Sequence, residues 1–167
     1  MNRIKQLIWA ITSRYKNIDG DFLKKYLNEN ELSLFNKLNI SEKHHSIRVC
    51  KDSIEYINNS SIKNKIDTNK MAKIALLHDI GKINKSLSVF DKCMVVILDK
   101  VTKGGLKKFN NNMKIDVYYN HGRMAYELLK NIGNYDKEFL QAVQMHHSKE
   151  TYKNIYLQIL KEMDDKN

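Results

Sequence analysis

The sequence predicts an all-α fold, a compact single-domain helical bundle. Apolar residues recur at spacings of three, four and seven along most of the 167-residue chain, as amphipathic helices require. The chain has no proline, no internal repeat and no low-complexity linker. Only a short stretch at residues 115–119 alternates between apolar and polar residues in the manner of a strand. We therefore expect about six to nine helices in one bundle.

The helices can be followed as apolar stripes in chain order. The stripes are Ile4, Leu7, Ile8 and Ile11; Ile47, Cys50, Ile54 and Ile57; residues 71–77; Val89, Cys93, Val96 and Val101; Met124, Ala125, Leu128, Leu129 and Ile132; Phe139, Leu140 and Val143; and Ile159, Leu160 and Met163. Ser88 is placed to cap the fourth stripe, while Gly20, Gly81 and Gly133 are placed as breaks. We expect residues 1–40 to form an N-terminal helical extension packed on a domain of residues 41–167.

Composition restricts the class of protein and its partners. The chain is 42% hydrophobic and 29% charged, which is typical of a globular protein. No apolar run approaches the roughly 20 residues that span a bilayer, and the basic N-terminus lacks a signal-peptide cleavage site. We therefore expect a cytoplasmic protein with no transmembrane segment and with Cys50 and Cys93 reduced. For residues 1–15 a membrane-surface helix is the alternative to an ordinary amphipathic one.

The net charge also bears on the partner. The formal charge of +10 favours an anionic partner, but the lysines are spread along the chain, with their densest cluster at residues 103–109. We expect a small phosphorylated substrate rather than specific nucleic-acid binding.

The histidines and two aspartates lie near the expected helix ends. They are His44, His45, His78, His121, His146 and His147, with Asp79 and Asp164. Taken singly, each has a structural explanation: His121 falls on the apolar face of its helix, and His146 and His147 are placed to compensate a helix C-terminus. Burying an unpaired aspartate at the end of an apolar helix is costly, however, and a divalent metal ion would remove that cost.

The residue types indicate which metal the group would hold. Imidazole and carboxylate ligands without cysteine suit Fe or Mn, or a catalytic Zn, better than a structural zinc site. Without His44, the remaining seven residues are too many for one ion with an open position, and suit two ions that share a carboxylate. We therefore expect two divalent metal ions, with Fe or Mn favoured and Zn, Mg or Ni as alternatives.

Five motifs in order resemble those of the HD-domain metal-dependent phosphohydrolases, in the subgroup that carries His-Asp-Ile-Gly. They are HSIRV (45–49), LLHDIGK (76–82), HGRMAYELL (121–129), VQMHHS (143–148) and ILKEMD (159–164). The sequence departs from the family at Gly122, where proline is common, and at Met163, where a small residue is usual. The Gly-Tyr-Pro element of the cyclic-dinucleotide phosphodiesterases is replaced by SKETYKN at residues 148–154.

The resemblance implies a ligand set and a reaction. One metal would be held by His45, His78, Asp79 and Asp164, and a second by His121, His146 and His147, with Asp79 bridging. Asp79 and Lys82 would be the catalytic residues, and Lys82 would bind the substrate phosphate. The implied activity is hydrolysis of a phosphoester or phosphoanhydride of a nucleotide or similar small phosphate compound, by a water that the metals activate.

Two other functions remain open at this point. One is a non-catalytic regulator of the same fold that binds metal or nucleotide without turnover. The other is a basic RNA-binding module, whose affinity would fall steeply with salt and would survive loss of His78 and Asp79.

Overall fold

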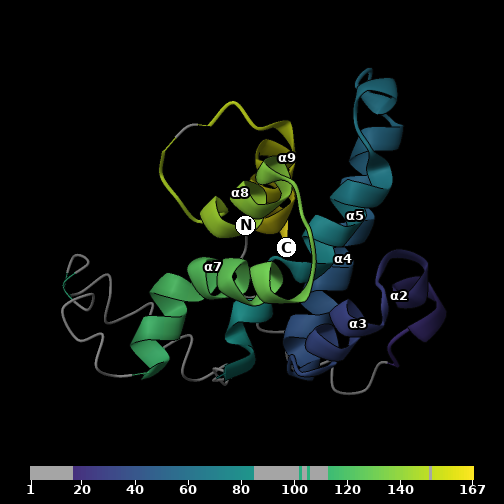
Figure 1. Cartoon of the computed structure of the whole chain (residues 1–167). Coiled ribbons are helices and arrows are strands. Elements are labelled where there is room, and N and C mark those ends of the chain that lie inside the picture. The colour runs from purple at the N-terminus through teal and green to yellow at the C-terminus, as the bar shows by residue number, and fades with distance from the viewer. Residues whose placement is uncertain (1–16, 85–101, 103–104, 106–112, 151) are drawn as a thin grey trace.

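The computed structural model describes residues 17–84, 102, 105, 113–150 and 152–167 (Figure 1). These residues contain α-helices, short 3-10 helices and connecting turns, and no β-strand. The predicted all-α fold is therefore confirmed. The predicted N-terminal stripe, the stripe from Val89 to Val101 with its Ser88 cap, and most of the lysine cluster lie outside the described residues.

Seven α-helices and two 3-10 helices are found in the described residues. They are α2 (Gly20–Tyr26), α3 (Glu29–Asn36), α4 (Ile40–Asn58), η2 (Lys63–Lys65), α5 (Thr68–Leu77), η3 (Ile80–Asn84), α7 (Met113–Ile132), α8 (Lys137–Met145) and α9 (Ile155–Lys166). Six of the α-helices begin after an aspartate or asparagine whose side chain accepts a backbone N–H bond, as expected of N-cap residues. These caps are Asp19, Asn28, Asn39, Asp67, Asp136 and Asn154.

Helix α5 lies at the centre of the bundle and contacts α2, α3, α4, α8 and α9. Its residues Met71, Ala72 and 74–77 have no exposed surface. A helix that is apolar on nearly every side is buried, because only the protein interior accepts all of its faces. As a result, the residues that follow α5, His78 and Asp79, also lie in the interior, with exposures of 0% and 1%.

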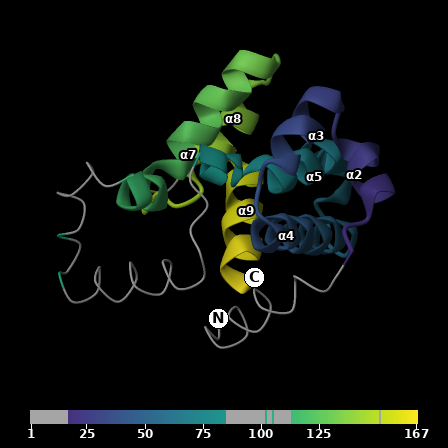
Figure 2. The same ribbon diagram turned by 90° about the horizontal axis from the view of Figure 1, so that it is seen from below.

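Helix α9 packs against both α8 and α4 (Figure 2). Its buried face consists of Tyr156, Leu157, Ile159, Leu160 and Met163. None of the helices that the structure describes has the length and hydropathy of a membrane-spanning segment.

Helix α7 differs from the prediction. It begins at Met113, so His121 lies within the helix rather than at its start, and residues 115–119 are helical rather than extended. The buried face of α7 continues upstream at a spacing of four, through Val117, His121, Ala125 and Leu129. A five-residue alternation is too short to outweigh that helical period.

Two glycines allow close contacts between the elements that carry the histidines. We expected Gly81 to end a helix, but it lies inside η3. A β-carbon there would overlap the carbonyl oxygen of His121 and lie 2.8 Å from the amide nitrogen of Ala125. At Gly122 a β-carbon would lie 2.6 Å from the carbonyl oxygen of Gln144. Side chains at these positions would push η3 away from α7, and α7 away from α8.

Helices α2 and α3 contribute Leu23, Leu34 and Phe35 to the core. The side chain of Glu31 in α3 pairs with Lys73 of α5 at 2.9 Å. These contacts fix the described part of residues 1–40 against the rest of the bundle. Its separation from residues 41–167 as an extension stays a prediction.

Candidate metal centre

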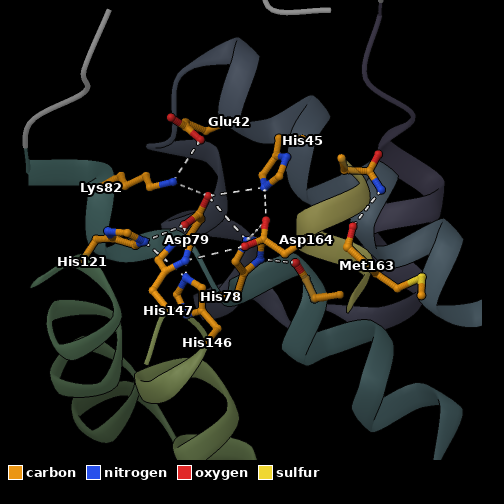
Figure 3. A network of polar contacts seen from close by, with 12 residues as sticks. Glu42, His45, His78, Asp79, Lys82, His121, His146, His147, Met163 and Asp164 are labelled. Atoms are coloured by element: carbon orange, nitrogen blue, oxygen red, sulfur yellow. Dashed lines mark hydrogen bonds and ion pairs between the residues drawn. The ribbon is translucent and has the colours of Figure 1, made fainter. Parts of the chain in front are cut away.

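The seven predicted ligands meet in one place, which we call the Asp79 cluster (Figure 3). Its members are His45 in α4, His78 at the C-cap of α5, Asp79 before η3, His121 in α7, His146 at the C-cap of α8, His147 after it, and Asp164 near the end of α9. His44 belongs to no candidate metal group in the described residues. Residues distant in the sequence thus form a single cluster of imidazoles and carboxylates.

Asp79 lies at the middle of the cluster and is 1% exposed. Its Oδ1 atom lies 3.3 Å from Nε2 of His121 and 3.8 Å from Nε2 of His146. Its Oδ2 atom lies 3.5 Å from Nε2 of His78 and 3.8 Å from Nε2 of His45. Each carboxylate oxygen therefore faces a different pair of imidazoles.

Three of the histidines are oriented by backbone carbonyl groups three or four residues earlier in the chain. The Nδ1 bonds run from His78 to Ala75 at 2.8 Å, from His121 to Val117 at 3.0 Å, and from His146 to Val143 at 2.7 Å. A carbonyl oxygen only accepts, so in the neutral form of each ring the proton is assigned to Nδ1 and the Nε2 lone pair faces the cluster. Histidine ligands of metal ions are oriented in this way.

The side of the cluster formed by His121, His146 and Oδ1 of Asp79 lacks donors among the described residues. Nε2 of His121 and Nε2 of His146 lie 3.2 Å apart, although both rings already place a proton on Nδ1. Among the described residues, Nε2 of His78 and Oδ1 of Asp79 are buried without a hydrogen-bond partner. Each buried unsatisfied polar atom costs about 1–3 kcal/mol. Facing lone pairs and an unsatisfied carboxylate oxygen are the groups that a cation would satisfy, so these residues fit a metal ion.

The candidate ligands fall into overlapping groups. In the described part of the chain they are Asp79, His121, His146 and His147; His45, His78 and Asp79; and His78, His146 and Asp164. Within each group the ligand atoms lie within 4.8 Å of one another. The first two groups share Asp79 and match the two sets that the family resemblance implied, apart from Asp164. Which ligands hold which ion stays a prediction.

Asp164 completes the cluster from α9. Its Oδ1 lies 2.9 Å from Nε2 of His45 and 3.7 Å from Nε2 of His78. Burial alone would raise the pKa of Asp164, but hydrogen bonds and charges of these two histidines hold it well below its usual range. The end of α9 is fixed by Asn167, whose amide donates to Oδ2 of Asp52 in α4 at 2.7 Å.

The same carboxylates act on His78. Burial alone would lower the pKa of His78, but the negative charges of Asp79 and Asp164 outweigh it and raise the pKa to about 9. In the absence of a metal ion, a proton therefore holds the position that a metal ion would take at this histidine.

His147 lies at the exposed edge of the cluster. Its side chain is 55% exposed, whereas that of His146 is fully buried. The His147 ring packs on His146 with 4.1 Å between ring centroids, and its Nδ1 lies 4.0 Å from Oδ2 of Asp164. Among the described residues, the cluster therefore reaches the protein surface at His147.

Lys82 contacts the cluster through Asp79. Its ammonium nitrogen lies 2.6 Å from Oδ2 of Asp79 and 3.6 Å from Oε2 of Glu42 in α4. Burial alone would lower the pKa of Lys82, but the two carboxylates outweigh it and raise the pKa, so the ammonium stays charged. Glu42 is not among the site residues predicted from the sequence. The available signal was its position three residues before His45, on the same face of one helix.

The sequence matches the HD domain family over residues 43–166. No curated protein and no solved structure matches the chain. The matched range covers most of the chain and contains every member of the Asp79 cluster. The chain therefore belongs to the HD domain family, whose members are typically metal-dependent phosphohydrolases.

Proposed function

We propose that this protein is a phosphohydrolase that uses two divalent metal ions to hydrolyse a phosphoester or phosphoanhydride bond in a nucleotide or a similar small phosphate compound. The observation that supports this most strongly is the position of Asp79, because its two oxygens face different pairs of histidines at 3.3–3.8 Å. That is the arrangement required of a carboxylate shared by two ions.

The nature of the ligands supports a catalytic site. Imidazole and carboxylate groups without a thiolate suit Fe or Mn and leave coordination positions for water and substrate. When bound, the metal ions supply Lewis acidity toward the phosphate and lower the pKa of a water molecule toward 7. The backbone bonds of His78, His121 and His146 hold their rings in place, so the ligand geometry requires little rearrangement.

Lys82 is proposed as the residue that binds the substrate phosphate. Its pKa is raised by Asp79 and Glu42, so it carries a positive charge at neutral pH. An ammonium group next to two metal ions would neutralise part of the charge that accumulates on a phosphoryl group during transfer. The net charge of +10 further favours approach of an anionic substrate.

The test combines metal content with a substrate panel. Protein purified without chelator is expected to contain divalent metal, close to two ions per chain, and to release phosphate from at least one nucleotide or phosphoester when Mn²⁺ or Fe²⁺ is supplied. The variant Asp79→Asn should lose both properties, whereas the exposed-site control Glu55→Gln should keep them. A protein that binds two ions but hydrolyses nothing in a broad panel would contradict the enzyme proposal and support a non-catalytic regulator.

A further inference from the structure

Lys82 lies between two buried carboxylates, and only one of them belongs to the Asp79 cluster. Its ammonium lies 2.6 Å from Oδ2 of Asp79 and 3.6 Å from Oε2 of Glu42 (Figure 3). The Glu42 side chain is 3% exposed and that of Lys82 is 16% exposed. The ammonium thus has a second carboxylate within reach of a small rotation of its own flexible side chain.

A metal ion shared by Asp79 and the histidines would compete with this ammonium. Oδ2 is the Asp79 oxygen that faces His78 and His45, and it is also the oxygen that accepts from Lys82. A divalent cation at that oxygen would repel an ammonium group bound to the same atom. The Lys82–Asp79 bond must therefore lengthen or break when the ion binds.

Glu42 is fixed where it could receive the ammonium. Its backbone N–H donates to Oδ1 of the N-cap residue Asn39 at 2.9 Å, which holds it in the first turn of α4. The same helix carries His45, so Glu42 and this cluster member belong to one rigid element. Glu42 also lies near enough to Arg48 for an electrostatic interaction.

We propose that Glu42 is a positioning residue that takes over the Lys82 ammonium when Asp79 binds metal. Glu42 thereby keeps the Lys82 ammonium beside the cluster, where a substrate phosphate would meet it. This inference rests on the proposed metal centre and deepens it. Lys82 would pair with Asp79 in the metal-free protein and with Glu42 in the metal-bound protein.

A double-mutant cycle on metal affinity tests the exchange directly. Mn²⁺ binding is measured by calorimetric titration of the metal-stripped full chain for wild type, Glu42→Gln, Lys82→Met and the double variant. We expect Glu42→Gln to weaken Mn²⁺ binding about tenfold when Lys82 is present and less than about twofold in the Lys82→Met background. Lys82→Met alone should bind Mn²⁺ more tightly than wild type, because the competing cation is gone.

The alternative is a direct effect of the Glu42 charge on the metal ion. In that case Glu42→Gln would weaken binding equally in both backgrounds, and the proposal would be overturned. Glu55→Gln, an equal charge change at an exposed position of α4, is the matched control and should leave the affinity within about twofold.

Two further results keep the test decisive. If Glu42→Gln does not fold, as judged by circular dichroism, the affinity of Lys82→Met alone decides, and binding no tighter than wild type overturns the exchange. If wild-type protein binds no Mn²⁺, Fe²⁺ or Zn²⁺, the proposed function itself fails together with this inference. Metal binding by wild type without coupling between Glu42 and Lys82 removes only the inference.

Discussion

Glu31 and Asp79 are both buried carboxylates, each 1% exposed, but their surroundings are opposite. Oε1 of Glu31 accepts from the Tyr135 hydroxyl at 2.8 Å and pairs with Lys73 at 2.9 Å. Its Oε2 accepts from the backbone N–H of Asn28 at 2.8 Å, which completes a capping box at the start of α3. Both oxygens of Glu31 are satisfied by groups of the chain itself.

Asp79 is satisfied only in part. Its Oδ2 accepts from Lys82, but its Oδ1 has no hydrogen-bond donor among the described residues and faces the lone-pair side of His121. The comparison separates two uses of a buried charge. A carboxylate completed by the chain holds helices together, whereas one with an oxygen left among acceptors fits an added cation.

The largest expected effect comes from replacing the incomplete carboxylate. Asp79→Asn should weaken divalent metal binding at least about a hundredfold and reduce phosphohydrolase activity about a thousandfold or more, because both proposed ions lose a shared anionic ligand. At neutral pH the metal-free variant should also be less stable than metal-free wild type, because Lys82 and protonated His78 lose the negative charge beside them. Metal titration and urea unfolding check the two statements. A metal affinity equal to that of wild type in this variant would show that Asp79 is not a metal ligand.

The next effect concerns the contact that brings Asp79 to His121. Gly81→Ala should lower the free energy of unfolding by about 3 kcal/mol, because a β-carbon there meets the backbone of α7 and cannot be accommodated by a side-chain rotation. Metal affinity should fall as well, since η3 and α7 separate. Gly20→Ala is the control, because nothing lies within 4 Å of its β-carbon position. Equal stabilities of the two variants would contradict the role assigned to Gly81.

The pH dependence of the stability of the metal-free protein reports on the charges around Asp79. The pKa of His78 is raised from 6.5 to about 9, so its contribution to stability is complete below pH 6.5 and is lost as the pH rises through 9. The free energy of unfolding should therefore fall by about 3 kcal/mol over that range. Urea unfolding at stepwise pH measures it. Asp79→Asn should show a smaller fall, and a flat wild-type profile would contradict the charge arrangement.

The smallest expected effect is at the completed carboxylate. Glu31→Gln should lower the free energy of unfolding by about 2 kcal/mol, because the ion pair with Lys73 is lost and the Tyr135 bond is weakened. Metal affinity should remain within about twofold of wild type, since Glu31 is not part of the Asp79 cluster. A large loss of metal binding in this variant would show that the two carboxylates are not independent.

Much of the fold could be predicted because the helical periods are long. The ends of α5 and α8 at His78 and His146 agree with the sequence prediction. The start of α7 differs from the prediction, because the residues preceding His121 carry aromatic and β-branched side chains that also suit a strand. Local pattern cannot decide such a stretch when tertiary packing extends the helix.

The members of the Asp79 cluster could be predicted as a set, but their partners could not. The role of Gly81 depends on how closely η3 approaches α7, and that approach is a property of packing between distant segments. Glu42 resembles any acidic residue in a first helical turn until Lys82 is seen beside it. Glu31 could have been noticed from the Asn-Glu-Asn-Glu capping box, but not its bonds to Lys73 and Tyr135.

Metal binding at Asp79 can be tested most simply by the change in melting temperature when Mn²⁺ is added to metal-stripped wild type, Glu31→Gln and Asp79→Asn. Binding to the native state at about a hundred times the dissociation constant adds about 2.7 kcal/mol, which is about 5 °C or more for a domain of this size. We predict equal rises for wild type and Glu31→Gln and no rise for Asp79→Asn. A rise in Asp79→Asn equal to that of wild type would contradict the claim that Asp79 is arranged for a metal ion.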